Sequence, residues 1–140
     1  MFKRALGIAV WPALISLLVT FARFFGERAN LPNAVTVVLG IIWLTFIVAI
    51  YWGVTLSDEE QPYRLLLLSL VLFTLLSRIP VFALWWITNT WALGTHYDFT
   101  DSLGQALLAQ LFGALTQIVP GTILGWTTLA LKRRQTPDPA

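Results

Sequence analysis

The sequence predicts an all-α fold, a bundle of four membrane-spanning helices with both chain termini on the cytoplasmic side. Three observations predict it: 57% of the 140 residues are hydrophobic, only 11% are Asp, Glu, Lys or Arg, and the apolar residues form four long runs. An ordinary soluble domain carries roughly 25% charged residues. So few charges cannot coat a soluble surface, and so apolar a composition excludes a disordered chain. The chain has no cysteine, which excludes disulfides, thiolate metal sites and a cysteine nucleophile.

The first two runs cover residues 5–25 and 34–56. Each reaches the length of about 20 apolar residues that a helix needs to cross a bilayer. The first run follows Lys3 and Arg4 and is uncharged up to Arg23. Its basic start also fits a signal peptide, an alternative that the length of the run disfavours. The second run contains no charged residue and is predicted to be one helix.

The third and fourth runs cover residues 65–91 and 103–131. The third contains one charged residue, Arg78, and the fourth contains none and stops at three consecutive basic residues. Because the connections are short, we expect consecutive helices to be antiparallel neighbours. Residues 1–134 are predicted to form one domain, and 135–140, with two prolines, a disordered tail.

The basic residues concentrate at one end of the predicted bundle. The loops on the other side carry only Arg23 and Arg28. Since Lys and Arg are enriched in cytoplasmic segments, this asymmetry predicts that both termini are cytoplasmic. We expect the membrane to be a plasma membrane, the inner membrane of a bacterium. The six basic residues on the predicted inner side are Lys3, Arg4, Arg64, Lys132, Arg133 and Arg134.

Arg78 is the one charge placed deep in an apolar run. It lies 14 residues beyond Arg64, which is about 21 Å along a helix and close to the membrane centre. Insertion scales put the cost of a central Arg at roughly 2.5 to 3.5 kcal/mol, so such residues face a partner or a watery cavity. No Asp or Glu lies in any of the four runs. Arg78 therefore has no carboxylate partner at its own depth within the chain.

Three kinds of partner for Arg78 follow from the sequence. Gln117 is expected at a similar depth on the fourth helix. Pro80 and Pro120 each leave one helix carbonyl without its usual donor, and these carbonyls can accept from a guanidinium. The third kind is external: a lipid phosphate, a small anion or a carboxylate on a partner subunit.

The fourth run carries small residues at four-residue spacing around Gln117. Gly113, Gly121 and Gly125 belong to this stripe, and Gln110 shares its face. Small residues let membrane helices approach closely. We expect the stripe to receive the third helix or a second copy of the protein.

The loop after the third run is the densest polar segment. His96, Asp98 and Asp101 suggest either a cation site or an interfacial acid–base centre, with Asn89 and Arg78 as supporting groups. The alternative is structural, because Asp101 or Ser102 suits the N-cap of the fourth helix. We predict no bound metal.

The function predicted from these features is binding. The chain is expected to hold an anionic lipid, a small ligand or a partner's membrane segment around Arg78, between the third and fourth helices. Gln117, Gln110, Asn89 and Arg23 complete the candidate ligand-binding set. The alternatives are an oligomeric transporter or channel subunit, and an interfacial enzyme that uses the His96 loop.

Several function classes are not expected. The sequence contains no phosphate-binding loop, HExxH motif, GxSxG motif or repeated metal-ligand spacing. Its basic residues are scattered, so we expect no nucleic-acid partner. We also predict no cofactor, and the expected partners are the lipid bilayer, an anionic ligand, and another copy or another membrane protein.

Overall fold

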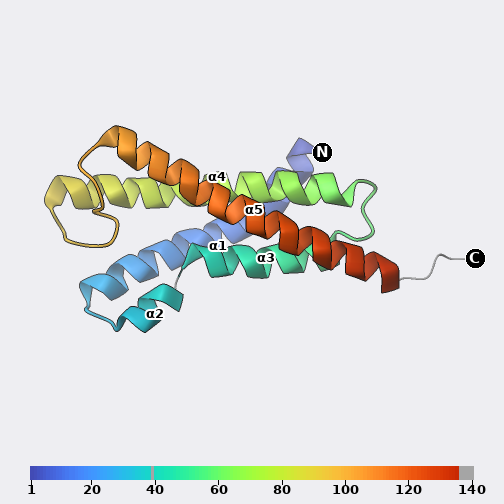
Figure 1. The fold of residues 1–140 in the computed structure, drawn as a ribbon, viewed down its shortest axis with the longest axis horizontal. Coiled ribbons are helices and arrows are strands. Elements are labelled where there is room, and N and C mark those ends of the chain that lie inside the picture. The colour runs from blue at the N-terminus through green and yellow to red at the C-terminus, as the bar shows by residue number, and fades with distance from the viewer. Residues whose placement is uncertain (39, 136–140) are drawn as a thin grey trace, which may run out of the picture.

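The computed structural model describes residues 1–38 and 40–135 and is helical apart from short connections (Figure 1). The four predicted spans are confirmed as helical segments long and apolar enough to cross a membrane. The predicted tail lies outside the described residues, except for Gln135, which ends the last helix. The helices are α1 (Phe2–Arg28), α2 (Asn33–Val38), α3 (Ile41–Thr55), α4 (Pro62–Trp91) and α5 (Leu103–Gln135).

The second span is not one continuous helix, contrary to the prediction. It divides into α2 and α3, and Gly40 just before α3 has an extended backbone with φ −88° and ψ 139°. Glycine is a poor helix former because it loses the most backbone freedom. The four residues 35–38 add three valines and a threonine, whose branched side chains also weaken a helix. The local sequence therefore favours a break inside this apolar run.

Most consecutive helices are not in extensive contact, contrary to the prediction that consecutive helices are neighbours. α1 packs mainly against α4, and α3 packs mainly against α5, while α4 and α5 are the one consecutive pair in extensive contact. α1 and α4 run in one direction, and α3 and α5 both run in the reverse direction (Figure 1). The bundle is thus two parallel pairs joined along α4 and α5.

Small side chains on α1 and α3 explain this pairing. The buried face of α1 consists of Ala5, Ala9, Pro12, Ser16, Thr20 and Gly26, at helical spacing. On α3, a methyl group added to Gly53 would lie 2.7 Å from the backbone oxygen of Gly125 on α5. Such close approach is how membrane helices gain packing contacts, since lipid is as apolar as their own side chains.

The glycine stripe of α5 is covered from two sides. Gly121 faces Leu70 of α4 and Thr45 of α3. Gly125 faces Leu66 of α4 and the backbone of α3 at Ala49. The structure therefore fills the stripe within one chain, and α3 takes part in it as well as the expected α4.

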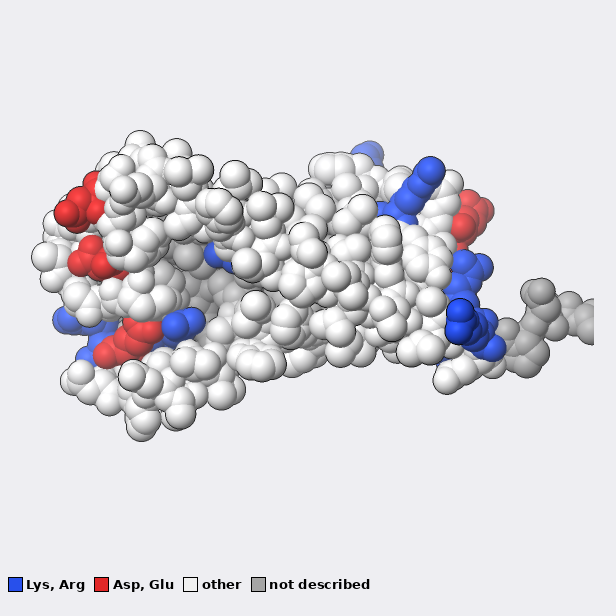
Figure 2. Space-filling model, in the orientation of Figure 1, with Lys and Arg blue, Asp and Glu red and all other residues white. Residues whose placement is uncertain are grey.

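Charged side chains gather at the two ends of the molecule, and the broad surface between them is almost free of charged residues (Figure 2). The start of α1, the α3–α4 connection and the end of α5 lie toward the same end (Figure 1). There Arg4 donates to Glu59 at 2.7 Å. Figure 2 also shows a basic group in a hollow between the two ends, where the pocket described next opens.

Candidate functional site

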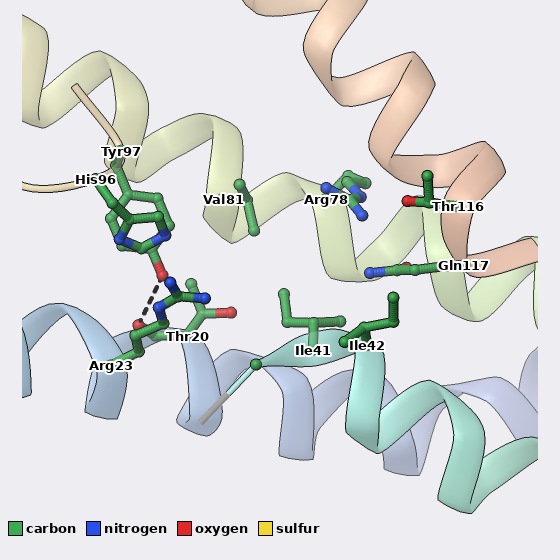
Figure 3. A pocket seen from close by; sticks show the side chains of 11 residues that line it. Thr20, Arg23, Ile41, Ile42, Arg78, Val81, His96, Tyr97, Thr116 and Gln117 are labelled. Carbon is green, nitrogen blue, oxygen red and sulfur yellow. Dashed lines mark hydrogen bonds between the residues drawn. The ribbon is translucent and has the colours of Figure 1, made fainter. Parts of the chain in front are cut away.

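All four spans contribute to one pocket in the half of the bundle away from the termini. Its volume is about 190 Å³. Figure 3 shows α4 and α5 on one side and α1 and the start of α3 on the other. The lining residues are Thr20, Arg23, Gly40, Ile41, Ile42, Arg78, Val81, His96, Tyr97, Thr116 and Gln117.

Arg78 reaches this pocket from the middle of α4. Its Nη2 donates to the backbone oxygen of Gly113 at 2.5 Å, and that oxygen also accepts from the Thr116 hydroxyl at 2.9 Å. A side chain at position 113 would collide with the guanidinium, so the glycine makes the close contact possible. Arg78 thus uses the Gly113 carbonyl, and not one of the two carbonyls that the prolines release.

The rest of the Arg78 guanidinium has no hydrogen-bond partner among the described residues. Its Nε is buried and makes no hydrogen bond to the described residues. In the described part of the chain, Arg4 pairs with Glu59 and Arg23 pairs with Glu27, and no ion pair includes Arg78. One carbonyl therefore compensates only part of the cost of placing this charge at membrane depth.

Gln117 lies beside Arg78 on the wall formed by α5 (Figure 3). Only 2% of this residue is exposed. Its Oε1 accepts from the Ser77 hydroxyl at 3.4 Å, while its Nε2 makes no hydrogen bond to any described residue. Figure 3 shows the amide nitrogen of Gln117 directed into the pocket, where it can donate to a ligand. This donor group lines the pocket.

The start of α3 forms the opposite wall. Gly40, Ile41 and Ile42 line the pocket, and no side chain of the described residues caps this helix. The first N–H groups of a helix have no partner within it, and the helix dipole places partial positive charge there. Backbone breaks at membrane depth occur where they line a cavity, as this one does.

A three-residue cluster of Arg23, Glu27 and His96 lies at the mouth of the pocket. Glu27 accepts from Arg23 Nε at 3.2 Å and contacts Nδ1 of His96 at 2.6 Å. Arg23 and His96 also line a second cavity of about 510 Å³ nearer the end of the bundle. The cluster therefore separates an outer vestibule from the inner pocket.

Tyr97 fixes the loop that carries His96. Its hydroxyl donates to the backbone oxygen of Thr20 on α1 at 3.3 Å, as the dashed line in Figure 3 shows. Burial raises the pKa of Tyr97 to about 12, so the hydroxyl stays protonated and can donate. Burial also lowers the pKa of His96 below its ordinary value, against the opposing effect of the Glu27 hydrogen bond, so His96 is neutral at pH 7.

The structure brings together only part of the predicted site. Arg78, Gln117 and Arg23 line the pocket, whereas Gln110 and Asn89 do not. Asn89 instead donates to the backbone of the outer loop, and Gln110 keeps a buried Oε1 without a partner among the described residues.

The polar loop is also divided between two roles. Of the three residues predicted as its functional group, His96 lines the pocket, and Asp98 and Asp101 do not. Asp101 accepts from Asn89 at 3.0 Å, and the Ser102 hydroxyl accepts from the Gln105 backbone at 3.5 Å, which matches the expected cap of α5. No group of three or more His, Asp or Glu residues in the described chain is arranged to hold a metal ion.

Sequence reasoning missed two components, the start of α3 and Glu27. The available signals were a glycine inside an apolar run and an Arg–Glu pair four residues apart near the end of α1. The contact of Glu27 with His96 joins residues 69 positions apart and leaves no local pattern.

The pocket has a clear electrostatic character. Its lining contains two arginines, a buried amide donor and a helix N-terminus, and no Asp or Glu. Such a surface attracts an anion, because charge-assisted hydrogen bonds are strongest where water is excluded. Comparison of the chain with protein-family models, with curated proteins and with solved structures finds no match.

Proposed function

We propose that this membrane protein binds an anionic group, a carboxylate or a phosphate, in the pocket at Arg78. The observation that carries the proposal is the donor set around one small cavity: the Arg78 guanidinium, whose Nε has no partner among the described residues, the Gln117 amide and the uncapped start of α3. An anion placed there would satisfy donors that the described residues leave without acceptors. Helix N-termini are well suited to this task.

The packing below the pocket favours binding over passage through a single copy. Toward the termini, Leu66 and Leu70 are fully buried and close against Gly125 and Gly121 of α5, and the fully buried Phe73 contacts Trp52 of α3. The vestibule at the other end leads toward Arg78. We therefore propose a site open on one side only.

We further propose that the pocket opens to the outer side of a plasma membrane. The end with both termini carries six basic residues, against Arg23 and Arg28 at the other end. The positive-inside rule places the richer end in the cytoplasm. In that orientation the vestibule faces outward.

The test is anion binding by the purified chain in phosphatidylcholine nanodiscs. Propionate and inorganic phosphate are titrated as soluble probes, and in a second arm phosphatidylglycerol replaces part of the lipid. We expect a saturable signal by calorimetry or thermal shift that Arg78→Leu abolishes. An Arg78-dependent signal with phosphatidylglycerol alone would assign the site to a lipid headgroup.

Arg28→Leu serves as the matched control, because Arg28 lies at the same end of the bundle and only holds the backbone of Leu93. It should bind as the unchanged protein does. Where Arg78→Leu fails to fold, Gln117→Leu provides the second variant and should weaken binding. Equal responses of all variants to every probe would contradict the proposal.

A further inference from the structure

The charges along the pocket are unevenly distributed. At its inner end, Arg78 carries one positive charge with no carboxylate beside it, and the start of α3 adds partial positive charge. At the mouth, the positive charge of Arg23 is matched by Glu27, whose other contact is His96. With His96 neutral, the mouth carries no net charge.

Glu27 lies close to the space that a ligand in the pocket would occupy. It contacts both Arg23 and His96, which themselves line the cavity. Its carboxylate is 17% exposed, so water screens it poorly. Glu27 does not itself line the pocket, and it acts by balancing the positive charge of Arg23. A second negative charge on a ligand would therefore find no unmatched positive charge at the mouth and would lose its water without compensation.

The remaining walls are apolar and the space is small. Val81 lies between Arg78 and His96, and Ile41 and Ile42 lie on the opposite wall of the pocket (Figure 3). At roughly 30 Å³ for each water in the liquid, a cavity of about 190 Å³ has space for about six waters or a ligand with a similar number of non-hydrogen atoms.

We propose that the ligand is a small, singly charged carboxylate with a short apolar chain, and that Glu27 restricts the site to one negative charge. The inference rests on the proposed anion site. The carboxylate would lie against Arg78, Gln117 and the start of α3. Its chain would lie along Ile41, Ile42 and Val81, toward the mouth.

Charge and shape both favour a carboxylate over a phosphate. A phosphoryl group carries between one and two negative charges near pH 7, whereas a carboxylate carries one. A planar carboxylate also matches the planar guanidinium. Inorganic phosphate and sulfate have no apolar group that could pack against the three apolar side chains of the wall.

The test compares ligands of equal length and different charge on the unmodified protein. Butyrate and succinate share a four-carbon chain and differ by one carboxylate. In phosphatidylcholine nanodiscs at pH 7.5 we expect butyrate to bind about tenfold or more tightly than succinate, because Glu27 already balances the charge of Arg23 and leaves nothing to match the second carboxylate. This comparison requires no variant and therefore does not depend on how a mutant folds.

Glu27→Gln identifies the residue responsible. The amide keeps the shape of the side chain but removes its charge, so the ratio of succinate to butyrate dissociation constants should fall at least about fivefold. Glu59→Gln, at the opposite end of the bundle, is the control and should leave the ratio unchanged.

The outcomes separate the inference from the function on which it rests. Succinate bound as tightly as butyrate, with both lost in Arg78→Leu, would overturn the one-charge inference and leave the anion site standing. An unchanged ratio in Glu27→Gln would show that Glu27 does not restrict the site to one negative charge. No saturable binding of any soluble anion or anionic lipid would overturn both.

Discussion

At the scale of single residues, the absence of a side chain at position 113 determines where Arg78 can go. The guanidinium occupies the space that a Cβ would need, and bonds the backbone oxygen of the same residue. The position of Arg78 was predictable from one charge in an apolar run. Its acceptor was not, since any backbone carbonyl on a facing helix can serve, and the choice depends on how closely α4 and α5 approach.

Gly113→Ala tests this contact. The added methyl group would displace the guanidinium, and we expect a loss of about 1 to 3 kcal/mol of stability, the usual cost of overpacking. Thermal unfolding in detergent micelles measures it. Gly7→Ala is the control, because a methyl group there meets nothing within 4 Å and should stabilise α1. An unchanged melting temperature of the Gly113→Ala protein would show that the Arg78 guanidinium can adopt another position without loss of stability.

His96 gives the molecule a pH dependence. Its pKa in the folded protein is lowered below the ordinary 6.5 by burial, so the unfolded chain binds a proton more readily. This contribution to stability is complete above pH 6.5 and is lost as pH falls through the lowered pKa of the folded state. The melting temperature should therefore decrease below pH 6.5, and His96→Gln should reduce that decrease. A slope identical in the two proteins would count against this assignment.

The same protonation should strengthen anion binding. A charged His96 adds a positive charge to the mouth of the pocket, beside Arg23 and Glu27. Butyrate remains ionised at pH 6, since carboxyl pKa values lie near 4. Its affinity should rise as the pH is lowered from 7.5 to 6, and calorimetry at several pH values checks this. His96→Gln should show a flat profile over that range.

At the scale of elements, hydropathy predicted where the helices lie but not how they pair. Lipid-facing and helix-facing sides are both apolar in a membrane, so an average over a window cannot distinguish them. The small residues Ala5, Ala9, Ser16 and Thr20 on one face of α1 contain that information, because only that face permits close approach. The break before α3 was missed for a similar reason, since hydropathy does not register backbone conformation.

Gly53→Ala tests the pairing of α3 with α5. The new methyl group would press on the backbone oxygen of Gly125, which cannot move as a flexible side chain does. We expect a loss of about 2 kcal/mol or more of stability, measured by thermal unfolding. Gly104→Ala, with only the Ser102 hydroxyl nearby at 3.8 Å, should be close to neutral. Equal melting temperatures for the two variants would contradict the close packing of α3 on α5.

At the scale of the whole molecule, the count of basic residues predicts orientation, and the lack of cysteine makes it measurable. Asp58→Cys and Asp98→Cys place single thiols at opposite ends of the bundle. A membrane-impermeant thiol reagent applied to intact cells should label the thiol at position 98, and label that at position 58 only after lysis. The reverse pattern would place the termini outside and the pocket mouth in the cytoplasm.

The pairing of α1 with α4 also bears on the order of events during synthesis. When α1 enters the membrane, its main partner has not been made, and Pro62, the first residue of α4, follows the end of α1 by 34 positions. At about 5 to 20 residues per second, the ribosome needs seconds to supply that partner. Until then the small-residue face of α1 is exposed to lipid. The pocket at Arg78 is thus completed late, because α5, which supplies Gln117, is translated after α1, α3 and α4.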